Sequence, residues 1–135
     1  MNLKSMSFNI QILIARIFIA SMFVVSGIGK IISFSSQTQF VNSSWIMNII
    51  PFLAAEVVLV IAIMMQLIGA TLILTGWNMK YGAYILMLFT FLALLMFYIE
   101  DLEIANILKN LSVIGGLLVL SMMHAGKFSL DEEEN

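Results

Sequence analysis

The apolar residues of this chain gather into long stretches joined by short polar links. The clearest stretches run from about Phe8 to Phe34, Ile50 to Leu74, Lys80 to Tyr98 and Ile107 to Met123. A helix rises about 1.5 Å per residue, so about 20 apolar residues cross the ~30 Å hydrocarbon core of a bilayer. The pattern therefore predicts an all-α fold, an integral membrane bundle of four transmembrane helices. We expect a single domain over residues 1–135, with an acidic tail at 129–135.

Composition supports a membrane protein and excludes several function classes. The chain has 61% hydrophobic and 10% charged residues, whereas soluble domains are about 45–50% apolar and about 25% charged. No stretch is basic enough to bind nucleic acid. Cysteine is absent and His124 is the single histidine, so we expect no protein-ligated metal or haem. Any electron chemistry would need a bound cofactor or a partner subunit.

The first stretch is expected to remain as a span rather than to act as a cleaved signal. Arg16 interrupts its apolar run, and no small-x-small cleavage site follows at Val24–Ile32. The longest link, residues 33–48, carries Trp45 where an interfacial anchor would lie. Pro51 fits the first turn of the next helix, where its missing N–H removes no internal hydrogen bond.

An even number of spans places both chain ends on one side of the membrane. That side has Lys4, Lys80 and Lys127, with Arg16 nearer to it, whereas the far side has Lys30 and Lys109. The positive-inside rule then favours cytoplasmic termini in the plasma (inner) membrane. The acidic runs, Glu100, Asp101 and Glu103 and the tail from Asp131 to Glu134, are interpreted as solvated ends.

Charged residues inside the spans are the main clue to function. Arg16, Ala20, Phe23, Gly27 and Lys30 recur at helical spacing on one stripe of the first helix. That stripe should face the bundle, because a charged side chain at the bilayer centre costs about 2.5–3.5 kcal/mol on insertion scales.

Depth along the helices predicts which charges meet. Counting by rise per residue places Lys30, Glu56 and Lys109 about 11–14 Å from the midplane on the non-cytoplasmic side, with Asn110 beside Lys109. The surplus positive charge of such a set would favour an anion or a polarised carbonyl. The alternative is that these charges only join helices, with the lysine ends reaching out to water.

Arg16 lies at another depth, about 8 Å from the midplane, where no carboxylate shares its level. Its guanidinium needs backbone carbonyls, a lipid phosphate, the acidic tail folded back or a bound anion, unless it simply reaches the headgroups. His124 is interpreted as a helix-terminal contact rather than a catalyst. Gln66 is expected to form an interhelical hydrogen bond, and the small residues Ser112 and Gly116 should allow close helix approach.

Several motifs occur together in a recognisable order. They are Ala15-Arg16, Ser26-Gly27-Ile28-Gly29-Lys30, Glu56 opening the second span, Lys109-Asn110 through Leu118, and Gly126-Lys127-Phe128-Ser129-Leu130-Asp131. Over about Ile12 to Asp131 this order resembles the DoxX family of small four-helix membrane proteins.

The resemblance implies membrane oxidoreductase activity. Relatives include subunits of a thiosulfate:quinone oxidoreductase and a member of a membrane complex that handles oxidative and thiol stress. The family's conserved polar positions fall on Arg16, Lys30, Glu56, Lys109 and Asn110. This chain has Phe97-Tyr98 where many members carry a histidine, which puts a proton-transfer or metal role at that point in doubt.

Two functions remain open on the sequence. In the first, the chain is a component of a quinone-linked membrane oxidoreductase, with a partner subunit or as a homo-oligomer. A cleft would bind a quinone or small anion at Arg16, Lys30, Glu56, Lys109 and Asn110, and Glu56 would be the catalytic proton relay. In the second, the chain is a non-catalytic membrane module, either a scaffold, a lipid-binding protein or a transporter subunit. The absence of cysteine, metal ligands and a cofactor fingerprint favours the second.

Overall fold

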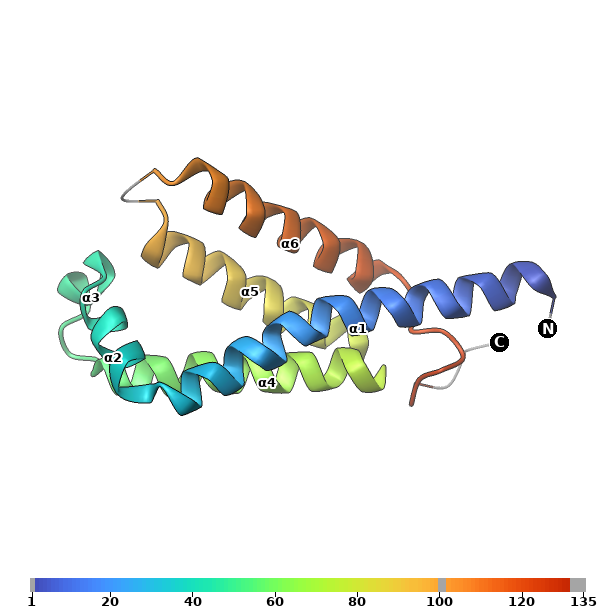
Figure 1. Cartoon of the computed structure of the whole chain (residues 1–135), viewed down its shortest axis with the longest axis horizontal. Helices are drawn as coiled ribbons and strands as arrows, with labels where there is room; N and C mark the ends of the chain where they lie inside the picture. Colours follow the sequence, from blue (N-terminus) through green and yellow to red (C-terminus); the bar gives the residue numbers. More distant parts are fainter. Residues whose placement is uncertain (1, 100–101, 132–135) are drawn as a thin grey trace.

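The computed structural model describes residues 2–99 and 102–131, and its regular structure there is entirely helical (Figure 1). The elements are α1 (Leu3–Ile32), α2 (Phe34–Asn42), α3 (Trp45–Ile49), α4 (Ala55–Thr75), α5 (Met79–Phe97) and α6 (Ile104–Met122). Over these ranges, four helices, α1, α4, α5 and α6, are long and apolar enough to cross a membrane. The prediction of an all-α bundle of four membrane-spanning helices is confirmed.

Helix ends follow local capping chemistry. The side chain of Asn2 accepts a hydrogen bond from the Ser5 N–H at 2.8 Å, which extends α1 to Leu3, before the predicted start at Phe8. The prediction for Pro51 was wrong, because α4 begins only at Ala55. Pro51 instead follows Ile50 in a turn closed by the Leu53 N–H on the Ile50 carbonyl at 3.1 Å, where a fixed φ fits equally well.

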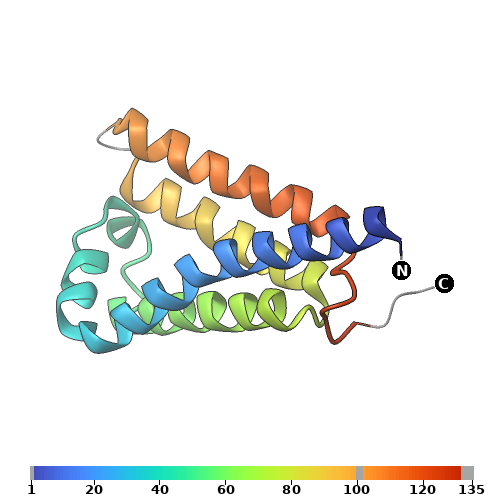
Figure 2. The ribbon, with the colours of Figure 1, turned by 45° about the vertical axis from the view of Figure 1, so that its right-hand side comes forward.

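The polar link 33–48 folds into the short helices α2 and α3. They lie at the end of the bundle opposite the chain ends, as Figures 1 and 2 show. Trp45 Nε1 donates to the Leu95 carbonyl at 3.0 Å, and the Phe40 and Phe97 rings stack with centroids 4.6 Å apart. These contacts fix both short helices to the end of α5.

The long helices pack in chain order, α1 on α4, α4 on α5 and α5 on α6, whereas α1 and α6 contact each other far less. α1 and α6 approach at the end that holds the chain ends and diverge toward α2 and α3 (Figures 1 and 2). α4 and α5 approach each other closely, because a Cβ added at Gly82 would lie 2.9 Å from the Gly69 carbonyl oxygen. The prediction that Ser112 and Gly116 allow close helix approach has less support: a Cβ at Gly116 would lie 3.7 Å from Ile19 Cδ1, an ordinary contact, and one at Gly115 would meet nothing within 4 Å.

The predicted inward stripe of α1 is confirmed, because Arg16, Ala20, Phe23 and Gly27 are all buried and Lys30 is half-buried. The first turns of α1 and the segment that follows α6 lie at the same end of the bundle (Figure 2), as an even number of spans requires. The acids Glu100, Asp101 and Glu132 to Glu134 lie outside the described residues.

Candidate functional site

A cavity of about 450 Å³ lies in the half of the bundle where α1 and α6 diverge. Binding sites for small molecules typically measure about 300–1,000 Å³. Most of its lining is apolar, with methionine and phenylalanine from α1, α2, α4 and α5. Its polar members are Ser26, Lys30, Gln37, Gln66, Thr90, Tyr98, Lys109 and Asn110. The cavity therefore combines an apolar wall with a few polar groups, as ligand sites do.

Lys30, Ser26 and Gln66 form a connected polar group in this cavity. Lys30 Nζ donates to Ser26 Oγ at 2.7 Å, one helical turn away on α1. Gln66 Nε2 on α4 donates to the same oxygen at 3.1 Å, which confirms the expected interhelical hydrogen bond. Lys30 Nζ also lies 5.7 Å from the centroid of the Phe89 ring. The cation is therefore held between α1, α4 and α5.

Gln66 has an unpaired polar atom although its side chain is only 2% exposed. Its Oε1 has no hydrogen-bond partner among the described residues. Leaving a buried acceptor unpaired costs about 1–3 kcal/mol. A buried polar atom without a partner is rare in native structures and makes this part of the cavity a candidate place for a ligand or a water.

Three apolar residues of the cavity wall are also exposed on the outside of the bundle. Met22, Ile61 and Leu92 line it, yet they are 46%, 51% and 43% exposed. Since the outer faces of membrane-spanning helices meet lipid, these side chains lie between the cavity and the surrounding lipid.

The structure brings together some of the predicted site residues and separates others. Lys30, Lys109 and Asn110 all line the cavity, although Asn110 Nδ2 also donates to the Asn106 carbonyl within α6, at 2.8 Å. Glu56 is exposed in the first turn of α4 and is not among the lining residues. The two lysines that were placed at one depth thus line one cavity, Lys30 half-buried and Lys109 exposed, whereas Glu56 lies outside it.

Arg16 lies elsewhere, fully buried in the other half of the bundle. Its Nε donates to the Ile73 carbonyl at 2.9 Å and its Nη2 to the Leu74 carbonyl at 2.6 Å. Its Nη1 donates to the Ala125 and Phe128 carbonyls at 3.0 Å and 2.8 Å. Four of the five guanidinium N–H groups are thus occupied by backbone carbonyls. Among the partners expected for Arg16, the structure has backbone carbonyls.

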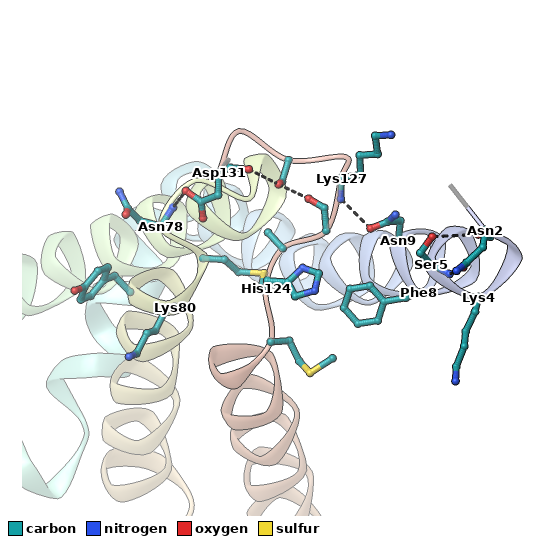
Figure 3. A pocket seen from close by; sticks show the side chains of 16 residues that line it. Asn2, Lys4, Ser5, Phe8, Asn9, Asn78, Lys80, His124, Lys127 and Asp131 are labelled. Carbon is teal, nitrogen blue, oxygen red and sulfur yellow. Dashed lines mark hydrogen bonds between the residues drawn. The ribbon is translucent and has the colours of Figure 1, made fainter. Parts of the chain in front are cut away.

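These contacts explain why the segment after α6, residues 123–131, lies against the bundle. The last carbonyls of a helix lack the N–H partners of the next turn, so those at the end of α4 can accept from Arg16, and a cation at that end also suits the helix dipole. Figure 3 shows two further attachments, from the Lys127 N–H to Asn9 Oδ1 at 2.9 Å and from the Asn78 N–H to Asp131 Oδ1 at 3.0 Å.

A wider hollow of about 1020 Å³ lies beside this segment, at the end of the bundle that holds the chain ends. The side chains of Lys4, Lys80 and Lys127 line it but point in different directions (Figure 3). The exposed His124 packs its ring against Phe8, with centroids 4.6 Å apart. Because its cations do not converge, this hollow is a weaker candidate than the Lys30 cavity.

The sequence also matches the model of a known protein family. The DoxX family model matches residues 11–99, which is most of the chain and covers α1 to α5 apart from the first turns of α1. The chain belongs to the DoxX family. The part matched to DoxX includes Lys30, Glu56 and Gln66, whereas Lys109 and Asn110 lie beyond it in α6.

Two relatives of this DoxX protein carry names that state a location. The inner membrane protein YqjF of Escherichia coli (strain K12) is 29% identical over 126 residues, covering 91% of this chain and 91% of the relative. The inner membrane protein YphA of the same strain is 28% identical over 130 residues, covering 90% and 89%. No solved structure matches the chain. With the four membrane-length helices, these names support an integral inner membrane protein.

Sequence reasoning missed the role of two polar side chains in this DoxX protein. Ser26 belongs to the motif before Lys30, and its spacing of one helical turn could have suggested the hydrogen bond. Gln66 was expected to bond between helices, but nothing in the sequence indicated that half of its amide would be left unpaired in a cavity.

Proposed function

We propose that this DoxX protein is the quinone-binding component of a membrane oxidoreductase and that the quinone occupies the Lys30 cavity. The observation that carries the proposal is a half-buried lysine in a mainly apolar cavity, hydrogen-bonded to a serine, Ser26, that also accepts from Gln66. Quinones are lipid-soluble, with an apolar ring and tail and polar oxygens on the ring. A mainly apolar wall suits the ring and tail, and the polar group suits the oxygens.

The Lys30 ammonium is proposed to assist reduction of the quinone as well as to bind it. Reduction of a quinone builds negative charge on its oxygens, and a fixed ammonium in a low-dielectric site stabilises that charge. Lys109 and Asn110 line the same cavity and are proposed to orient the second oxygen. Electrons are proposed to come from a partner subunit, because the chain has no cysteine and a single histidine.

Glu56 is proposed to relay protons from outside the cavity. It is exposed at the start of α4, one turn before Leu59, which is buried and lines the cavity. Glu56→Gln should therefore reduce quinone turnover by the protein with its partners while leaving quinone binding unchanged. Equal turnover in the variant would remove Glu56 from the mechanism.

The binding experiment compares two lysines in similar local settings. Lys30 Nζ lies 5.7 Å from the Phe89 ring and Lys80 Nζ lies 5.9 Å from the Tyr84 ring, but only Lys30 lines the cavity. Lys30→Met should weaken binding of a short-chain naphthoquinone about tenfold, since hydrogen bonds to charged groups contribute about 1.5–3 kcal/mol. Lys80→Met should bind as the unmodified protein does. Quinone is measured by titration in lipid nanodiscs and by mass spectrometry of the purified protein.

The second function predicted from the sequence, a non-catalytic membrane module, has a distinct outcome in the same experiment. A purified protein that carries only phospholipid, and that binds naphthoquinone no better than empty nanodiscs, would favour a lipid-binding or scaffolding role.

A further inference from the structure

We infer that the Lys30 cavity selects a ligand that carries a hydroxyl group over one whose oxygens only accept hydrogen bonds. The inference rests on the proposed function, since it concerns the same cavity. It goes further by assigning Gln66 as a ligand-binding residue and by specifying which oxidation state of a quinone binds more tightly.

The argument begins with the two kinds of polar atom that the cavity offers. Lys30 Nζ is a hydrogen-bond donor whose one hydrogen bond within the described chain is to Ser26 Oγ. Gln66 Oε1 is an acceptor without a partner there, on a side chain that is 2% exposed and lines the cavity. Lys30 Nζ and Gln66 Nε2 both donate to the same Ser26 oxygen, at 2.7 Å and 3.1 Å, so the two side chains that carry the donor and the acceptor meet at Ser26.

Ligand chemistry then decides which molecule fits. A hydroxyl group both donates and accepts, so a phenol or a hydroquinone can donate to Gln66 Oε1 while its oxygens accept from Lys30. A quinone carbonyl or an ether oxygen only accepts, so it leaves Gln66 Oε1 buried and unpaired. The complex with a carbonyl ligand is therefore less stable by the free energy that an unpaired buried acceptor costs.

The consequence is a preference for the reduced ligand. A hydroquinone and its quinone share the same ring, tail and apolar contacts, so the difference between them isolates the hydrogen bond to Gln66. We expect the hydroquinone to bind about tenfold more tightly, the equivalent of one hydrogen bond to a buried partner.

The test uses the whole protein in lipid nanodiscs under anaerobic conditions. Three probes are titrated: a prenylated naphthohydroquinone, the corresponding naphthoquinone, and the dimethyl ether of the hydroquinone, which cannot donate. The naphthohydroquinone should bind about tenfold more tightly than either of the others. Gln66→Met keeps the length of the side chain without its amide and should remove that difference. Gln39→Met changes an exposed glutamine of α2 that does not line the cavity and should preserve it.

Each outcome has a separate meaning. Equal binding of the three probes, or tighter binding of the naphthoquinone, would overturn the inference and leave the proposed function standing. The latter result would mean that the amide presents its NH₂ group to the ligand. Failure of all three probes to bind would overturn the proposed function as well. A preference that survives in Gln66→Met would place the acceptor elsewhere and also overturn the inference. If Gln66→Met does not fold, the three probes on the unmodified protein still decide.

Discussion

Two cations on the same stripe of α1, Arg16 and Lys30, have different roles in this molecule. Arg16 uses four of its N–H groups on backbone carbonyls and is fully buried. Lys30 makes a single hydrogen bond in the described chain, to Ser26, and faces a cavity. A charge inside a membrane bundle is therefore no proof of a ligand site. Arg16 and Lys30 differ in how many of their hydrogen-bond donors have no partner within the described chain.

Replacing Arg16 should destabilise the fold. Arg16→Met removes four hydrogen bonds, and such bonds in membrane proteins contribute about 0.6 kcal/mol each on average. We expect the free energy of unfolding to fall by about 2–3 kcal/mol, with faster proteolysis of residues 123–131. Thermal unfolding in detergent measures the first effect and limited proteolysis the second. Lys80→Met is the control, and a variant as stable as that control would contradict the role given to Arg16.

Depth along the helices predicted Lys30, Lys109 and Asn110 correctly as neighbours of one cavity, because rise per residue is nearly constant. The same count could not predict that Glu56 would lie outside the cavity, since depth does not fix the direction in which a side chain leaves its helix. The partners of Arg16 were also beyond sequence reasoning, because the Ala125 carbonyl belongs to a segment 109 residues away.

At the scale of elements, glycine residues allow α4 and α5 to pack closely against each other. A Cβ at Gly69 would lie 2.7 Å from Leu86, and a Cβ at Gly82 would lie 2.9 Å from the Gly69 carbonyl oxygen. Between them Gly76 ends α4 with a φ of 71°, a left-handed conformation that favours glycine. The short link between the helices and their close packing therefore depend on the same residue type.

Gly82→Ala should weaken this helix pair, because backbone on the facing helix cannot move aside as a flexible side chain can. We expect a loss of about 1–3 kcal/mol in the free energy of unfolding, which is typical of overpacking. Gly115→Ala is the matched control on α6, where an added Cβ meets nothing within 4 Å. It should be neutral or stabilise the helix by up to about 1 kcal/mol. Similar stability of the two variants in thermal unfolding would show that α4 and α5 do not pack this closely.

The helices differ in how far the sequence could predict them. The four spans are marked by long apolar runs, so their existence was clear and only their ends moved, as Pro51 shows. α2 and α3 lie in a polar link with no strong apolar pattern. They are held by contacts to α5, such as that of Trp45 with the Leu95 carbonyl, which a local pattern cannot reveal.

At the scale of the whole molecule, the two ends of the bundle have different roles. One end is closed by the segment 123–131, bound through Arg16, and the other contains the cavity under α2 and α3. If the chain ends face the cytoplasm, as we propose from the positions of the cationic residues, the cavity lies in the outer half of the membrane.

Orientation can be measured cleanly because the chain contains no cysteine. Lys127→Cys places a thiol at the end with the chain ends, and Asn42→Cys places one at the exposed end of α2. With a membrane-impermeant maleimide, we expect Asn42→Cys to react in cells with a permeabilised outer membrane. Lys127→Cys should react only after the inner membrane is opened. The reverse pattern would mean that the chain ends face outward.

The most direct test of the central claim is to find where a quinone binds. A prenylated, photoreactive naphthoquinone is activated on the protein in nanodiscs, and the attachment sites are identified by mass spectrometry. The account predicts attachment at cavity residues such as Met22, Met65 and Met96, competed by unlabelled ligand, lost in Lys30→Met and kept in Lys80→Met. Attachment confined to outward residues such as Phe18 and Val25, which are 73% and 71% exposed, and unchanged in Lys30→Met, would contradict it.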